Sequence, residues 1–456
     1  MEAVLEKVTS NPAQPNQTTR VLGSFLGQKT GFLLQNFQLT DGLGKSRIVV
    51  RLSGVETLRL RQVSSRPSDG GIFQNYLVFV PVADSGLQRA TVAGVSPAQG
   101  TVVESVTPSL QATIQNRDTT VKANSIVLRV NGSVVTPTIQ SDANGATVSY
   151  ALTPLPAPNS TVTARLTFAD SADVTQTNEW SFTLNYKALD PAIRVPGPGL
   201  ARGFNLRLVQ APQGSALENS LQRAENQLIA NSSIPAAIST NFTADVINFN
   251  KMEGPRGNFE NDALLPHLDP AGNGLDDFAV EITAYLDLSA GIHRFGVVSD
   301  DGYKISSSRN LNDASAPPLG FHNGGPANET FDFVVPQAGL YPFRMLWYER
   351  GGAGYAEWFS VDLAAGERTL INDPTLPKAI KAYRTVTLAP ALRLESAATV
   401  TGPFALETGA VVDAQARTIT LPLSANAVRF FRINADVQKK FSTIRITGNQ
   451  IIIGYQ

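Results

Sequence analysis

Residues 285–306, YLDLSAGIHRFGVVSDDGYKIS, set two adjacent carboxylates, Asp300 and Asp301, in the middle of an alternating, strand-like run. Charged residues make up only 16% of the chain, so a pair of neighbouring aspartates inside a strand pattern needs a reason. Two interpretations stay open. Because Asp-Gly pairs favour tight turns, Asp300, Asp301 and Gly302 can form the turn of a hairpin. Alternatively, the two carboxylates can bind a metal ion that prefers oxygen ligands.

The composition of the chain excludes several classes of protein. Lys and Arg total 37 against 38 Asp and Glu, so the formal net charge of −1 gives no general attraction to nucleic acid or to an acidic membrane. The absence of cysteine excludes disulfides, cysteine-ligated zinc and thiolate catalysis. No run of about 18 apolar residues could span a bilayer. The N-terminal residues lack the pattern of a secretory signal, so we expect either a cytoplasmic protein or part of a longer exported one.

The length and the turn residues predict several domains built from short strands. The chain has 456 residues, with 36 glycines and 28 prolines. We therefore expect an all-β fold with β-sandwich domains in tandem and one amphipathic helix near 215–231. The predicted domains are a partial jelly-roll-like module at 1–88, an immunoglobulin-like sandwich at 89–188, a third sandwich at 189–379 and a small C-terminal β-module at 380–456.

The first two predicted domains rest on strand patterns. In the first, alternating runs at 46–65 and 75–84 predict half-buried strands, too few for a complete sandwich. In the second, Asn131-Gly132 lies between two apolar runs and predicts a tight hairpin. Trp180 and Phe182 share one face of a strand, so we expect both in the core. This segment resembles the bacterial immunoglobulin-like modules that space functional domains on exported proteins.

The third predicted domain contains the one convincing helix. Leu217, Leu221, Ala224 and Leu228 form an apolar stripe at helical spacing, and Ser215 with Glu218 makes a capping box at the start. Strands are predicted at 275–287 and 292–306, followed by a group of three between 329 and 363.

The motifs of this third domain occur in a specific order over residues 204–375. An Ala-Gly turn precedes each of two strands, Asp300-Asp301-Gly302 follows the first, and the second carries Tyr341-Pro342 and then Tyr348-Glu349-x-Gly-Gly, with Trp358 beyond. This ordered set resembles the PA14 family, a β-sandwich module of bacterial toxins, glycosidases and fungal adhesins.

The resemblance implies a calcium site. In the adhesin branch of the PA14 family, two aspartates joined by a cis peptide bind a calcium ion that grips vicinal hydroxyls of a terminal sugar, and Asp300 and Asp301 stand at the matching position. Ca²⁺ takes six to eight oxygen ligands, which carboxylates, carbonyls, water and sugar hydroxyls can supply. Where the adhesins have an asparagine in a second ligand loop, this chain has Glu349, as the bacterial members do. We expect Glu349 to be a third ligand.

Further ligand-binding residues are expected around this site. The loop 306–330 lies between the motif strands, and we expect its Asn310, Asn312 and Asn323 to contact the glycan. Trp347 and Tyr348 are adjacent and face opposite sides of a strand, so one is expected in the core and the other exposed. We take Trp347 as the candidate ring on which a sugar stacks.

Other candidate sites fail on spacing. Residues 269–281 imitate an EF-hand loop, but Ala271 and Val280 stand where oxygen ligands are required. The three histidines show no zinc-binding spacing. No nucleophile, phosphate-binding or dinucleotide-binding motif is present, so we do not expect an enzyme.

These patterns favour a non-catalytic bacterial protein of the cell surface or secretome that binds a glycan or polysaccharide through calcium. Two alternatives stay open. One is a structural protein of a surface layer, fibre or matrix, whose partners are further copies of the chain or other surface proteins. The other is the accessory part of a larger carbohydrate-active enzyme.

Overall fold

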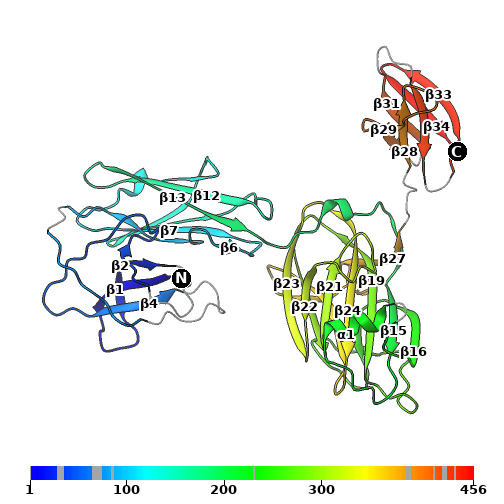
Figure 1. The fold of residues 1–456 in the computed structure, drawn as a ribbon, viewed down its shortest axis with the longest axis horizontal. Coiled ribbons are helices and arrows are strands. Elements are labelled where there is room, and N and C mark those ends of the chain that lie inside the picture. Colours follow the sequence, from blue (N-terminus) through cyan, green and yellow to red (C-terminus); the bar gives the residue numbers. More distant parts are fainter. Residues whose placement is uncertain are drawn as a thin grey trace. The chain divides into compact units, whose positions relative to one another are not determined.

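The computed structural model describes residues 2–27, 35–63, 74–83, 87–229, 232–386, 392–413, 416–423, 429–435 and 438–456. It divides into two compact units, Met1–Lys187 and Ala188–Gln456. Strands dominate both units, and α1 is the one α-helix in the described ranges, which confirms the all-β prediction (Figure 1). Two short 3₁₀ helices are at Ala123–Ser125 and Pro191–Ile193. In these ranges no helix is long and apolar enough to cross a membrane.

The first sheet of unit 1 has the strand order β3-β2-β1-β4. Its strands are β1 (Glu2–Ser10), β2 (Thr18–Leu26), β3 (Leu39–Thr40) and β4 (Leu58–Val63). The prediction for this region was partly wrong: only β4 forms within the run 46–65, and residues 74–83 contain no strand. Two strands that the alternation did not reveal, β1 and β2, take the central places instead. Since a strand needs a hydrogen-bonded partner, the alternating pattern alone did not suffice.

The rest of unit 1 consists of two sheets with orders β10-β11-β7-β5 and β6-β13-β12-β8-β9. Asn131 and Gly132 connect β8 to β9 with φ of 48° and 83°, so the predicted hairpin is confirmed. Trp180 and Phe182 are 2% and 1% exposed, in the core as expected. The strands are β5 (Thr91–Ser96), β6 (Val102–Val103), β7 (Ser109–Gln115), β8 (Val127–Val130), β9 (Ser133–Val135), β10 (Thr138–Asp142), β11 (Gly145–Ala151), β12 (Thr161–Ala169) and β13 (Thr175–Leu184).

Unit 2 contains two large sheets that enclose one core. The larger sheet runs β14-β27-β19-β24-β21-β22, and β15 joins it through β19 and carries β16 on its other side (Figure 1). The smaller runs β18-β17-β25-β20-β23, with β26 paired to β25. The strands are β14 (Gly199–Arg202), β15 (Phe204–Gln210), β16 (Ile238–Ala244), β17 (Asn248–Asn250), β18 (Ala263–Leu264), β19 (Phe278–Leu288), β20 (Gly291–Asp300), β21 (Tyr303–Ser307), β22 (Pro318–His322), β23 (Ala327–Val335), β24 (Gly339–Glu349), β25 (Tyr355–Val361), β26 (Arg368–Leu370) and β27 (Lys381–Val386).

The core between these sheets is aromatic. Phe295 packs against Phe333, with ring centroids 4.9 Å apart, and both rings contact Phe343. Trp358 packs against Phe295 and Phe343 and is fully buried. Such rings contribute large apolar area and fix the two sheets against each other. This rigid core holds the strand ends that carry the candidate site.

Helix α1 (Leu221–Leu228) lies on the outer face of the larger sheet (Figure 1). Ala224 and Leu228 are buried against Leu346 and Tyr348, and Leu221 packs beside them, so this part of the predicted apolar stripe is confirmed, whereas Leu217 lies before the helix. The predicted start was wrong, because the N-cap is Ser220, whose side chain accepts from the Arg223 amide, and not Ser215. The Asp277 carboxylate binds the amides of Ala216 and Leu217 and holds them outside the helix.

The C-terminal module has two small sheets, β29-β28-β32 and β30-β31-β34-β33. Its core includes Leu394, Ile419, Leu421 and Ile453. The preceding strand β27 belongs to the larger sheet of the sandwich, so that sheet extends past the predicted boundary at residue 379. The strands are β28 (Arg393–Ala397), β29 (Ala405–Leu406), β30 (Val411–Asp413), β31 (Thr418–Pro422), β32 (Phe430–Asn434), β33 (Phe441–Thr447) and β34 (Gln450–Tyr455).

Candidate metal and ligand site

Asp300 and Asp301 lie where the chain passes from one sheet to the other. The run predicted as one strand is split here: β20 ends at Asp300 in the smaller sheet, and β21 begins at Tyr303 in the larger one. The peptide bond between Asp300 and Asp301 is cis, as the PA14 resemblance implies. A Cβ at Gly302 would lie 2.5 Å from the His322 carbonyl oxygen, so glycine is required at this passage.

Neighbouring strands fix both backbone units of the pair. The Trp347 indole Nε1 donates to the Asp300 carbonyl at 3.0 Å, and the Asp301 amide donates to the Tyr348 carbonyl at 3.0 Å. The Ser299 hydroxyl donates to the Asp301 carbonyl at 2.7 Å. With the main chain held in this way, the two carboxylates keep a defined direction.

Glu349, the last residue of β24, brings a third carboxylate to the pair. One oxygen each from Asp300, Asp301 and Glu349 lies within 4.8 Å of the other two. Calcium binds oxygen at 2.3–2.6 Å, so ligands on opposite sides of one ion are about 5 Å apart. Asp301 is 5% exposed and Glu349 is fully buried, whereas Asp300 is partly exposed. The three predicted metal ligands are thus brought together, with Asp300 on the solvent side.

A buried lysine is the fourth charged group of this cluster. Lys251 Nζ lies 2.7 Å from Glu349 Oε1 and 2.7 Å from an oxygen of Asp276, and its side chain is 1% exposed. Its stem crosses Gly354, where a Cβ would lie 2.6 Å from Lys251 Cδ. We call Asp300, Asp301, Glu349 and Lys251 the cation site. When ionised, the three carboxylates outnumber the one ammonium, which Asp276 also shares, so the site carries an excess of negative charge that a divalent cation can neutralise.

The crowding of carboxylates shifts their pKa values. Burial, together with the charges of Asp301 and Asp300, raises the pKa of Glu349 to about 8, although Lys251 opposes the rise. Burial and the adjacent Asp301 charge raise the pKa of Asp300 to about 6. Burial lowers the pKa of Lys251, but its two carboxylate partners raise it above the ordinary value overall. Without a cation, the site therefore disfavours ionised carboxylates.

The hydrogen bonds of the site leave one position open. Asp301 accepts from Asn219 Nδ2 at 2.9 Å and from the Arg350 amide at 2.8 Å. Glu349 Oε2 is buried and has no hydrogen-bond partner in the described part of the chain. Because an unpaired buried carboxylate oxygen is costly, this atom fits a cation that binds beside it. The donor set, all oxygen and net negative, suits calcium.

Two of the expected ligand-binding asparagines, Asn310 and Asn312, make their hydrogen bonds away from the carboxylates of the cation site. Asn310 is exposed and accepts from the Asn312 amide in a local turn. Asn312 instead donates to Glu281 at 2.8 Å, and Asn323 accepts from the Leu221 amide at the start of α1. Trp347 is fully buried and packs edge-on against Phe278, so it offers no exposed ring for a sugar. Tyr348 is equally buried, so the expectation of one exposed ring was wrong.

Sequence reasoning missed Lys251, Asp276 and Asn219. Asp276 was considered only as part of an EF-hand-like loop. Its neighbour Asp277 instead binds the backbone amides that precede α1. A lysine at the end of a short strand has no local signal, because its partners Glu349 and Asp276 come from distant segments. Pairing β17 with β25, which follows the Glu349 loop, would have pointed to it.

The comparisons with known proteins gave similarities among solved structures alone. No family model and no curated protein matches the chain. The epithelial adhesin 9 A domain from Candida glabrata, in complex with Galβ1-3GlcNAc, is 13% identical, and the match covers 44% of this chain and 95% of the adhesin domain at a TM-score of 0.30. The PA14 domain of the MpAFP antifreeze protein is 17% identical, covering 43% and 97% at 0.28. The PA14 sugar-binding domain from an RTX adhesin is 17% identical, covering 38% and 96% at 0.26.

PA14 domains are thus among the solved structures similar to this chain.

Proposed function

We propose that this chain is a non-catalytic carbohydrate-binding protein of the cell surface or secretome, and that its cation site holds the Ca²⁺ through which a sugar binds. The observation that carries the proposal is the meeting of three carboxylates within 4.8 Å, one with a buried oxygen that lacks a partner in the described ranges. Asp300, Asp301 and Glu349 would be the protein ligands of the ion.

Two features support a sugar as the ligand, namely the geometry of the cation site and the resemblance of residues 204–375 to the PA14 family. Asp300 is the partly exposed ligand, so a bound ion would be reached from its side. Since calcium takes six to eight oxygens, three carboxylates leave coordination positions for water or for vicinal sugar hydroxyls. The resemblance supplies the class of ligand, a glycan with a terminal sugar.

The test is calorimetry on the full chain. Ca²⁺ is titrated into metal-free protein, and β-lactose or Galβ1-3GlcNAc is then injected with and without excess EDTA. We expect saturable calcium heat and a glycan signal that EDTA removes. Calcium heat without any glycan signal would leave a metal site but reject the lectin function, and no calcium heat would reject the proposal as a whole.

A specific observation favours a second candidate, assembly into a surface layer or fibre. Strand β33 forms one edge of its sheet, and every residue in it is exposed, including Ile444 at 59% and Ile446 at 64%. An exposed apolar edge is a template for strand pairing with a second copy. Light scattering with the parent and with Ile446→Lys decides this: assembly that the lysine abolishes supports it, and a monomeric parent rejects it.

A further inference from the structure

A polar groove crosses the outer face of the larger sheet, away from the cation site. It has a volume of about 460 Å³ and is lined by residues of β15, β16 and β19 and by Asn312 from the loop after β21. This volume is in the range of pockets that bind small ligands, roughly 300–1,000 Å³. Tyr348, beside Asp301, lies four positions after Arg344, beside the groove, on the same strand, a separation of about 13 Å.

The register of the strands builds the groove floor. Asn205 on β15 pairs with Thr243 on one side and Thr283 on the other. In the next row, Arg207 pairs with Asn241 and Glu281. Because side chains at paired positions point to the same face of a sheet, these rows place amides, hydroxyls and one guanidinium side by side.

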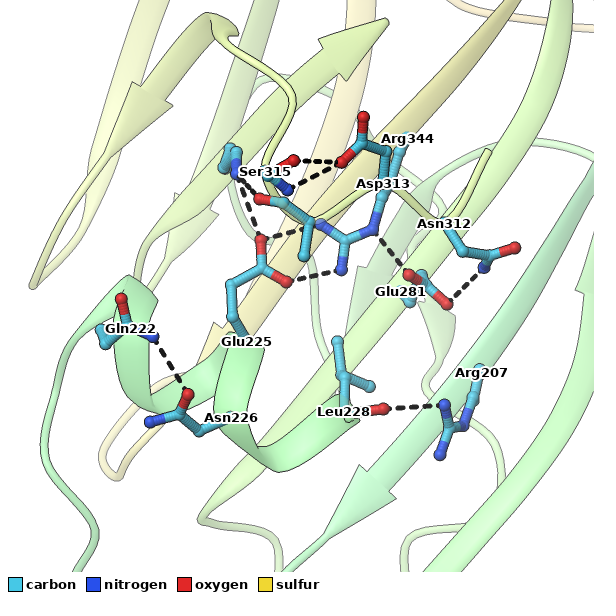
Figure 2. Close-up of polar contacts among 12 residues, drawn as sticks. Arg207, Gln222, Glu225, Asn226, Leu228, Glu281, Asn312, Asp313, Ser315 and Arg344 are labelled. Carbon is cyan, nitrogen blue, oxygen red and sulfur yellow. Dashed lines mark hydrogen bonds and ion pairs between the residues drawn. The ribbon is translucent and has the colours of Figure 1, made fainter. Parts of the chain in front are cut away.

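The charges beneath the groove cancel one another. Arg344 donates from Nε to Glu281 at 2.6 Å and from its two terminal nitrogens to both oxygens of Glu225, at 2.8 and 2.7 Å (Figure 2). Lys304 also pairs with Glu225, at 3.3 Å. We call Arg344, Lys304, Glu225 and Glu281 the charge network. With two cations and two carboxylates it carries no net charge, so it does not call for a metal ion.

Several polar groups that line the groove are free to bind a ligand. Thr283 is only 8% exposed, yet its hydroxyl has no hydrogen-bond partner among the described residues. The side chains of Asn241 and Thr243 likewise make no hydrogen bond there. Asn312 uses its Nδ2 on Glu281, and Arg207 donates from one terminal nitrogen to the Leu228 carbonyl, as Figure 2 shows. Both side chains line the groove.

The chemistry of this lining selects the ligand. A metal or a phosphate would need several like charges, and the single guanidinium of Arg207 does not supply them. A purely apolar ligand would leave the hydroxyls and amides of the lining unpaired, whereas a sugar offers both hydroxyls for these groups and apolar C–H faces for the rest of the lining. Hydroxyls and amides each combine donor and acceptor capacity, which matches the hydroxyl groups of a sugar. We propose that this groove is a second ligand site, which binds a neutral sugar unit without a metal ion.

The test uses the full chain in excess EDTA, so that no calcium-dependent site contributes. Threonine methyl groups are isotope-labelled, and D-glucose, D-galactose, D-mannose and N-acetyl-D-glucosamine are titrated separately to high concentration while NMR spectra are recorded. We expect at least one sugar to shift the methyl signals of Thr243 and Thr283 saturably. Asn241→Ala removes one amide that lines the groove and should weaken that binding at least about fivefold.

Ser239→Ala is the matched control, because Ser239 lies two residues along the same strand but outside the groove lining. The affinity of Ser239→Ala for the sugar should equal that of the parent. If none of the four sugars shifts the two methyl signals, or if Asn241→Ala binds as tightly as Ser239→Ala, the proposal is overturned. The EDTA condition makes this outcome independent of whether the cation site binds calcium.

Discussion

The cation site and the charge network are two buried charge clusters that contact the same helix. Arg223 of α1 donates to the Glu349 carbonyl, whereas Glu225 of α1 belongs to the charge network and accepts from Arg344. The network balances two carboxylates with two cations, and both oxygens of Glu225 and of Glu281 are paired. The cation site sets three carboxylates against Lys251 and leaves an oxygen of Glu349 without a described partner.

This difference shows why buried carboxylates alone do not mark a metal site. A fully paired cluster holds strands and a helix together and leaves no excess charge for a metal ion to neutralise. An unbalanced cluster of carboxylates carries an excess of negative charge, which a divalent cation neutralises. Variants that alter the balance in either cluster therefore test the distinction directly.

The largest effect is expected from Arg344→Met. This change leaves Glu225 and Glu281 without their buried partner, and breaking such a network costs roughly 3–5 kcal/mol. Urea unfolding followed by tryptophan fluorescence measures the loss of unfolding free energy, with Trp347 and Trp358 reporting on unit 2 after Trp180 of unit 1 is replaced by Phe in parent and variant alike. Arg294→Met is the control, because Arg294 pairs with Asp332 while its side chain is 40% exposed, and it should cost about 1 kcal/mol or less. Equal costs for the two variants would show that the network is not a structural cluster.

The second prediction concerns Asp301→Asn. Removing one ligand charge should weaken calcium binding by about 100-fold or more, or about 2.7 kcal/mol, while the fold persists. Calcium calorimetry measures the affinity, and circular dichroism checks the fold. Asp287→Asn is the control, because Asp287 is an exposed carboxylate near the end of β19 that lies away from Glu349. This variant should bind calcium with the affinity of the parent. Equal calcium affinity in Asp301→Asn and the parent would remove this residue from the site.

The third prediction changes the balance in the opposite direction. Lys251→Met removes the ammonium beside Glu349, so one more negative charge faces the ion and calcium affinity should rise at least about tenfold. Lys304→Met is the control, because Lys304 pairs with Glu225 in the charge network and should leave calcium affinity unchanged. A Lys251→Met variant that binds calcium more weakly than the parent would show that the lysine supports the ion instead of competing with it.

The three carboxylates of the cation site could be predicted from the sequence, because the ordered motifs around them resemble the PA14 family. The structure brings Asp300, Asp301 and Glu349 together. Lys251 could not be found in this way, since it reaches the site through the pairing of β17 with β25. The groove depends on the register of β15 with β16 and β19, which no local pattern encodes.

Two predictions were wrong because contacts between segments distant in the sequence decided the local structure. The start of α1 was placed too early, because Asp277 binds the amides that a local capping box was expected to serve. Trp347 was expected to be exposed because adjacent strand residues face opposite sides. Here the core buries one face and α1 buries the other, so both Trp347 and Tyr348 are covered.

The last prediction is a fall in stability with rising pH when no metal is bound. The pKa of Glu349 is raised from its ordinary 4.5 to about 8, so the folded protein retains a proton that the unfolded chain releases near pH 4.5. This contribution to stability is fully present below about pH 4.5 and is lost as the pH rises through about 8. In EDTA we expect the melting temperature of unit 2 to fall by an amount on the order of 5 °C between about pH 6 and 9.

Calcium and Glu349→Gln separate the causes of this fall. Calcium at about pH 9 should restore the melting temperature, because the ion stabilises the ionised carboxylates that burial disfavours. Glu349→Gln carries no proton to release and should show a clearly smaller fall in EDTA. The raised pKa of Asp300 acts with the same sign at lower pH, so a residual slope in the variant is expected below about pH 6. A fall of the same size in the variant and the parent would show that Glu349 is not the group responsible.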